Sequence, residues 1–236
     1  MPRTARIAPK EFVYHVLTRG NNRQDIFQDE EDYQKYISIL EKYKEKYKFK
    51  LYHYVLMTNH VHLVIEPTDT GGALSQIMKG LNLSYAQHYK TKYKHIGHFW
   101  QDRYKSIIIS KDEYLLACGN YVELNPVRAK IVEDPKDYAW SSYRAHAYGR
   151  RDVLIDEHPF YFQLSEEEKE RQKKYREFVR GMLKGKEAMK GEMDRRLVYG
   201  SRDFVKSVAT AYNISEKIKR MGRQTGWRKN KENRPL

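Results

Sequence analysis

Cysteine is almost absent from this 236-residue chain, in which Cys118 is the one example. A single cysteine excludes an internal disulfide and any zinc site built from several cysteine ligands. No apolar run approaches the length of a membrane span, and the N-terminus lacks the apolar core of a signal peptide. We therefore expect a cytoplasmic protein with no membrane partner.

Acidic residues are also scarce relative to basic ones. Lys and Arg total 45 against 31 for Asp and Glu, which gives a net charge of +14 and a sequence pI near 9.6. That balance favours a polyanionic partner, of which nucleic acid is the commonest. From residue 165 onward the chain has 21 basic and 11 acidic residues, so most of the excess positive charge lies there.

Hydrophobic periodicity predicts the order strand, helix, strand, strand, helix, strand, helix, with a short hairpin turn at 58–59. The expected strands are 11–18, 49–57, 60–66 and 103–109, and the expected helices are 29–48, 73–93 and 111–124. Ser110 to Glu113 matches a capping box, and Pro126 should end the last helix. This order predicts an α+β fold: a ferredoxin-like split βαβ antiparallel sheet with one extra helix.

The remainder of the chain reads as an appendage to that core. We expect a first domain at 1–150 and a basic helical extension at 151–236, with helical stretches near 165–184, 202–211 and 215–221. The last residues, 222–236, are basic and poor in aliphatic side chains, which predicts a disordered tail that could order on a phosphate backbone.

His60 and His62 are the first candidate functional residues. Residues i and i+2 of a strand point to the same face, and two neutral imidazoles so placed can bind one divalent cation. The flanking residues are apolar on both faces, which predicts a central, covered strand where polar rings need partners. Without that support, two histidines on a solvated strand face would be the alternative. Ligand chemistry alone would favour zinc.

Tyr121 and Asn125 are the second candidates. They lie four residues apart on the expected last helix and therefore share one face. Asn125 could offer a carbonyl oxygen to the same cation while Tyr121 faces a phosphate. A core aromatic and a C-terminal helix residue set by Pro126 are the alternatives at these two positions.

In combination, these segments resemble the single-tyrosine HUH transposases, and among them most closely the REP-associated tyrosine transposases. The resemblance covers roughly 11–148, and its blocks occur in the family's order: 14–16, 19–23, 55–62, 121–129 and 140–143. It implies that His60 and His62 ligate Mg²⁺ or Mn²⁺ and that Asn125 stands at the third, amide-ligand position. Asn125 is shorter than the glutamine common in related insertion-sequence transposases, so it could bind only through water or only once DNA arrives.

The resemblance also implies the reaction and the substrate. Tyr121 would be the nucleophile that forms a 5′-phosphotyrosine bond and releases a free 3′-hydroxyl, in a metal-dependent single-strand DNA endonuclease and strand transferase. The DNA would be single-stranded and lie beside an imperfect palindromic, REP-like hairpin. The candidate DNA-binding residues are Arg19, Arg23, Arg103, Lys105 and Arg128, with Trp100 and Phe99 as stacking platforms.

The sequence leaves other interpretations of function and oligomeric state open. A domesticated, non-catalytic nucleic-acid-binding regulator would keep the fold and the basic surface, and a phosphodiesterase would use water in place of Tyr121. His15 is expected to be structural. The active protein could be a monomer with its site closed within one chain, or a homodimer that exchanges tyrosines. The short connection at 106–111 favours the monomer.

Overall fold

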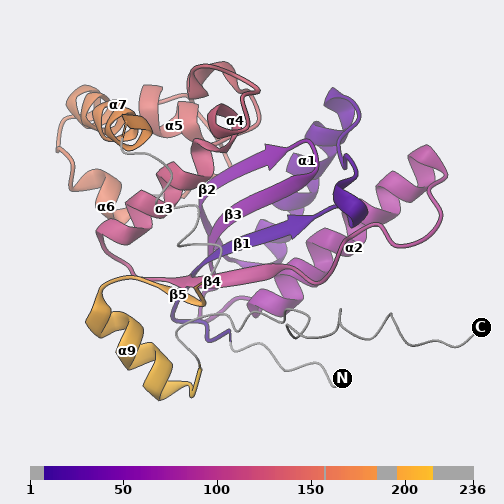
Figure 1. Cartoon of the computed structure of the whole chain (residues 1–236), viewed down its shortest axis with the longest axis horizontal. Helices are drawn as coiled ribbons and strands as arrows, with labels where there is room; N and C mark the ends of the chain where they lie inside the picture. The colour runs from indigo at the N-terminus through magenta and orange to yellow at the C-terminus, as the bar shows by residue number, and fades with distance from the viewer. Residues whose placement is uncertain (1–7, 157, 185–195, 215–236) are drawn as a thin grey trace, which may run out of the picture.

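The computed structural model of the chain describes residues 8–156, 158–184 and 196–214. At its centre is a five-stranded sheet in the order β2-β3-β1-β4-β5. Its strands are β1 (Val13–Arg19), β2 (Lys50–Met57), β3 (His60–Glu66), β4 (Lys105–Ile109) and β5 (Val198–Tyr199) (Figure 1). The first four pair antiparallel in the ferredoxin-like order, which confirms the predicted fold class. The short β5 pairs parallel with β4 and was not predicted.

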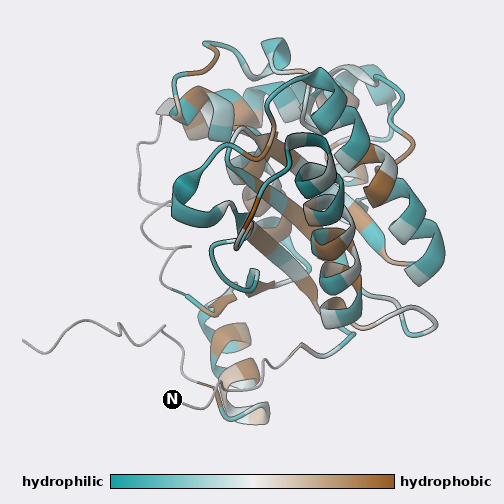
Figure 2. Cartoon of the chain, turned by 90° about the vertical axis from the view of Figure 1, so that its right-hand side faces the viewer, coloured by the Kyte–Doolittle hydropathy of each residue, from teal (hydrophilic) through white to brown (hydrophobic). Residues whose placement is uncertain are grey.

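Strand β3 lies between β2 and β1 and is covered on both faces, as predicted. Its odd-numbered side chains, such as Leu63, pack against α1 (Glu30–Tyr47) and α2 (Leu74–Tyr93). In Figure 2 these two helices lie over an apolar sheet with their hydrophilic sides outward. The even-numbered Val64 packs on the opposite face with residues of α3 (Glu113–Glu123). Side-chain alternation therefore directs His62 toward α3.

Helix α3 begins one turn beyond β4. Its N-cap is Asp112, whose side chain accepts a hydrogen bond from the Tyr114 backbone N–H at 3.0 Å, whereas Ser110 donates its hydroxyl hydrogen to Asp112. The predicted capping pair is thus wrong in its residues, although the helix is confirmed. At its other end the chain passes directly into α4 (Asn125–Arg128). Pro126 occupies the first turn of α4, where its missing N–H has no helical partner to lose.

The C-terminal third of the chain packs on this core. Helices α5 (Tyr143–Tyr148), α6 (Pro159–Phe162) and α7 (Glu168–Lys184) gather beside α3 (Figure 1) and share an apolar cluster with it. Helix α9 (Arg202–Ala211) follows β5 and matches the predicted stretch. The remaining elements are the short 3-10 helices η1 (Asn21–Arg23) and η2 (Pro135–Asp137). The predicted helix at 215–221 and the tail at 222–236 lie outside the described residues.

Candidate active site

His60 and His62 lie on the same face of β3, with ring centroids 4.9 Å apart. His60 is half-buried, and its Nδ1 lies 2.6 Å from Oδ1 of Asn59. Because an amide oxygen only accepts, His60 donates its Nδ1–H to Asn59. His62 is 4% exposed, and its Nδ1 lies 2.7 Å from Nε2 of His15. Each ring is thus held through Nδ1, as histidines that ligate metals commonly are.

Electrostatics keep the deeper ring neutral. Burial lowers the pKa of His62 well below its ordinary value, and the nearby His15, His60 and Arg19 lower it further. The neutral imidazole is the form that binds metals, so the chemistry of this pair fits a divalent cation. Two nitrogen ligands alone are a zinc-like set, whereas Mg²⁺ or Mn²⁺ would need oxygen ligands from elsewhere.

Tyr121 projects from α3 against these rings. Its ring meets that of His62 edge-on at 6.3 Å between centroids and that of His15 at 5.9 Å. The guanidinium carbon of Arg128 lies 4.9 Å from the centroid of the Tyr121 ring, and Nη1 donates to the Tyr121 carbonyl oxygen at 2.9 Å. The structure therefore brings the predicted nucleophile against a predicted ligand. It also packs Arg128 on that nucleophile.

Asn125 is the first residue of α4 and is half-buried. Its Nδ2 donates to the carbonyl oxygens of Tyr121 at 2.9 Å and Val122 at 3.1 Å. The amide therefore caps the end of the tyrosine helix, and Oδ1 is the atom that it could offer to a cation.

The predicted DNA-binding residues other than Arg128 gather at one end of the sheet. Arg19, at the end of β1, lies opposite His60 in the strand register, and the carbonyl oxygen of Arg23 accepts a hydrogen bond from Asn59. Lys105 begins β4 on the neighbouring strand and is exposed, as is Arg103. These cations therefore lie at the end of the sheet where β3 begins with His60.

Trp100 and Phe99 differ in what they can offer to a base. Phe99 is 3% exposed and packs within the core, so its prediction as a stacking platform is wrong. Trp100 is half-buried, and its indole N–H donates to the Asn82 carbonyl oxygen at 2.8 Å. It lines an open cavity of about 590 Å³ together with Arg103 and the exposed Leu83.

Behind Tyr121, Glu123 is the centre of a second polar cluster. Among the described residues, His53, Glu123 and His146 form the one group of three or more His, Cys, Asp or Glu side chains with metal-ligand spacing, with ligand atoms within 4.8 Å of one another. However, Oε1 of Glu123 accepts hydrogen bonds from His53 and His146, at 2.9 and 3.1 Å, and from Ser142 at 2.6 Å. Oε2 accepts from Tyr175 of α7 at 2.6 Å. These donors satisfy the carboxylate and join the end of α3 to β2, α5 and α7.

The charge of this carboxylate is maintained despite its burial. Burial raises the pKa of Glu123, but His53 and His146 and their hydrogen bonds outweigh that effect and hold the pKa below its usual range. Glu123 therefore remains ionised at neutral pH in a site with no solvent exposure.

His15 and Glu123 were not predicted as site residues. An acidic residue amid the apolar positions of α3 was a signal for Glu123, because a buried carboxylate requires partners. No comparable signal identified His15, since its contact with His62 depends on how β1 and β3 align.

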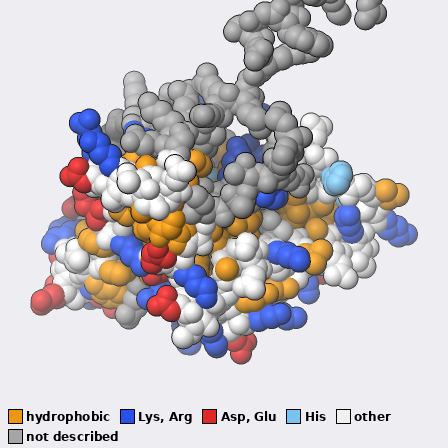
Figure 3. Space-filling view, turned by 90° about the horizontal axis from the view of Figure 1, so that it is seen from below, with side chains coloured by type: hydrophobic (Ala, Val, Ile, Leu, Met, Phe, Trp, Pro, Cys, Tyr) orange, Lys and Arg blue, Asp and Glu red, His pale blue; other side chains and the backbone are white. Residues whose placement is uncertain are grey.

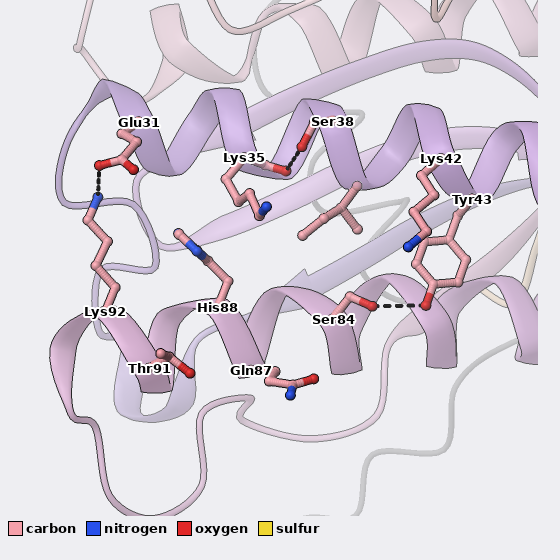
Figure 4. Close-up of a pocket in the computed structure, with 11 residues that line it drawn as sticks. Glu31, Lys35, Ser38, Lys42, Tyr43, Ser84, Gln87, His88, Thr91 and Lys92 are labelled. Carbon is pink, nitrogen blue, oxygen red and sulfur yellow. Dashed lines mark hydrogen bonds and ion pairs between the residues drawn. The ribbon is translucent and has the colours of Figure 1, made fainter.

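The remaining surface carries charges of both signs. Figure 3 shows Lys and Arg side chains scattered over the face seen from below. An open hollow of about 620 Å³ lies between α1 and α2 and is lined by Lys35 and Lys42, but it lies on the side of the sheet away from Tyr121 (Figure 4).

Among the described helices, none has both the length and the apolar character to cross a bilayer.

Comparison with known proteins identifies the family of the chain. Residues 9–125, about half of the chain, match the family described as "Transposase IS200 like". The fold is similar to a solved structure of a REP-associated tyrosine transposase bound to a REP hairpin, at 18% identity and a TM-score of 0.53, covering 66% of this chain and 92% of that one. A candidate transposase of Deinococcus radiodurans R1 also has 18% identity, at a TM-score of 0.37, covering 55% of this chain and 92% of that one. No curated protein matches the chain.

The fold and the matched segment define a transposase. This chain belongs to the IS200-like transposase family, and its fold is similar to that of a REP-associated tyrosine transposase.

Proposed function

We propose that this transposase is a metal-dependent single-strand DNA endonuclease and strand transferase that acts through a 5′-phosphotyrosine intermediate. The observation that carries the proposal is the meeting of His60, His62 and Tyr121 rings under α3. A binding module has no evident use for paired imidazoles against a buried tyrosine. The proposed ligands are His60, His62 and Oδ1 of Asn125, with Mg²⁺ or Mn²⁺ as the ion.

The chemistry assigns a role to each residue. When bound, the cation would act as a Lewis acid on a phosphate oxygen. Oη of Tyr121 forms a bond to phosphorus as the bond from phosphorus to O3′ breaks; the phenolic proton goes to solvent, and the departing O3′ takes up a proton from solvent to become a free hydroxyl. A second 3′-hydroxyl can reverse this step on a new strand, because the phosphotyrosine bond conserves the energy of the phosphodiester. Arg128, over the ring, would favour the phenolate.

The DNA would run along the basic end of the sheet. Arg19, Arg23, Arg103 and Lys105 are proposed to contact phosphates, and the cavity beside Trp100 could take a base. The neighbour's bound REP hairpin supports a hairpin substrate for this chain as well. The basic segment from residue 165 onward is proposed to contact the hairpin stem through phosphates.

We further propose that the site is closed within one chain, in a cytoplasmic monomer. The contact between the His62 and Tyr121 rings of the same chain supports this arrangement. So does the length of the connection between β4 and α3, which spans only 110–112.

The test is a covalent-adduct assay. Labelled single strands, drawn from palindromes flanking the gene and from a random hairpin pool, are incubated with Mn²⁺ or Mg²⁺ and run on a denaturing gel. We expect a protein-linked 3′-side fragment from the wild type and from Tyr114→Phe, a control on the same helix. Tyr121→Phe, His62→Ala and chelation should abolish it.

The other outcomes correspond to the rival functions. Free cleavage products that persist in Tyr121→Phe would identify a water nucleophile. Tight hairpin binding with no cleavage of any DNA in the pool would identify a non-catalytic regulator.

A further inference from the structure

His15 and His62 form a closely packed pair on the face of the sheet that α3 covers. His15 lies on β1, and its Nε2 is 2.7 Å from Nδ1 of His62. The rings are nearly parallel, at 10°, with centroids 4.9 Å apart. Both residues are buried, and the Tyr121 ring packs roughly perpendicular to both rings. The pair is therefore shielded from solvent directly beneath the proposed nucleophile.

The hydrogen bond between two neutral imidazoles holds a single proton, so one ring donates and the other accepts. If His15 donates from Nε2, the neutral His62 ring carries its own proton on Nε2 and cannot ligate a cation. If His62 donates from Nδ1, its Nε2 presents a lone pair. Only the second arrangement is compatible with the proposed metal site.

We propose that His15 is a positioning residue for the metal site: its Nε2 accepts the Nδ1–H of His62 and holds that ring with Nε2 ready to ligate. This inference rests on the proposed function, because it assigns His62 to the metal. Metal-ligating histidines commonly donate their second ring N–H to an acceptor that fixes the tautomer and the ring orientation. Asn59 occupies the same position for His60.

The unsatisfied side of His15 supports this role. Nδ1 of His15 is buried and has no hydrogen-bond partner among the described residues. An unpartnered buried polar atom destabilises a fold, and a phenylalanine could stack on His62 without one. Packing alone therefore does not explain why this residue is a histidine, whereas a role as the hydrogen-bond acceptor for His62 does.

The test measures Mn²⁺ affinity of the full-length protein by titration, with the EPR signal of free Mn²⁺ as the readout. The matched pair is His15→Gln, whose amide can reach the position of Nε2, and His15→Asn, whose amide reaches only that of Nδ1. We expect His15→Asn to weaken Mn²⁺ binding by about 10–100-fold, the usual loss when an outer partner is removed. His15→Gln should remain close to the wild type. His98→Gln, at an exposed histidine, is the control.

His15→Phe distinguishes a positioning role from a purely structural one. It keeps a ring that can stack but offers no acceptor, so we expect it to lose Mn²⁺ affinity like His15→Asn while adduct formation recovers at saturating Mn²⁺. Circular dichroism verifies that each variant is folded. Should the Phe variant not fold, the comparison of Gln with Asn decides.

Two results would overturn the inference and are distinguishable. Wild-type affinity in both His15→Asn and His15→Phe would refute the role of His15 and leave the metal site intact. A wild-type protein that binds no Mn²⁺ would refute the metal assignment of the proposed function, and this inference with it.

Discussion

Replacing Glu123 measures how strongly the buried cluster behind α3 holds the fold together. The carboxylate accepts hydrogen bonds from His53, Ser142, His146 and Tyr175. Glu123→Ala removes the acceptor for all of them, whereas Glu123→Gln keeps one oxygen and loses the charge. Tyr175→Phe deletes a single donor from the far side.

The magnitudes follow from the number and kind of bonds lost. Removing one partner from a buried charged network costs about 3–5 kcal/mol, so we expect about 3–5 kcal/mol of unfolding free energy to be lost in Glu123→Ala. Charge assistance strengthens each of the four hydrogen bonds by about 1 kcal/mol, which predicts a loss of up to about 4 kcal/mol in Glu123→Gln. Tyr175→Phe should lose about 1.5–3 kcal/mol.

Urea denaturation at pH 7, followed by circular dichroism, gives these free energies by linear extrapolation. Glu133→Gln, at an exposed carboxylate, is the control and should lie within about 0.5 kcal/mol of the wild type. A loss of less than about 1 kcal/mol in Glu123→Ala would refute the reasoning, because four buried donors cannot lose their acceptor so cheaply.

Other substitutions and conditions lead to further predictions. Arg128→Met removes the guanidinium above the nucleophile's ring, so single-turnover adduct formation should slow by up to about 30-fold, from a cation–π interaction of up to about 2 kcal/mol. An unchanged rate would contradict this role of Arg128. A Cβ on Gly119 would lie 2.2 Å from Nε2 of His53, so Gly119→Ala should lower the free energy of unfolding by about 1–3 kcal/mol. Gly181 in α7 has open space around it, so Gly181→Ala should leave that free energy unchanged or raise it by up to about 1 kcal/mol. Equal melting temperatures for the two variants would contradict this prediction. Burial lowers the pKa of His15 from 6.5 to about 4, so the unfolded chain binds its proton first as pH falls. The stability that this neutral ring contributes is present above pH 6.5 and is lost, by about 3 kcal/mol, as pH falls toward 4. The unfolding free energy of His15→Phe should therefore depend less steeply on pH across this range than that of the wild type. An identical pH dependence would show that His15 is not its source.

Much of the fold follows from local pattern. The stripe on α1 and the hairpin of β2 and β3 have enough residues for their periodicity to predict them. Strand β5 has only two residues, Val198–Tyr199, and exists because it pairs with β4. Two residues have no period, so no reading of the sequence could have found it.

The site divides in the same way. That His60 and His62 share a face follows from strand alternation, and the closeness of Tyr121 follows from helix α3 crossing that face. The contact of His15 with His62 depends on the strand register, which alternation alone does not fix. The Glu123 cluster joins residues from β2, α3, α5 and α7, and no spacing rule connects them.

The central claim is that Tyr121 becomes covalently joined to DNA, and peptide mass spectrometry tests it most directly. The adduct formed with hairpin DNA and Mn²⁺ is digested with nuclease and trypsin, and the modified peptide is sequenced. We predict a nucleotide 5′-phosphate on Tyr121 and on no other tyrosine. A nucleotide on another residue, or cleaved DNA with no modified peptide, would contradict it.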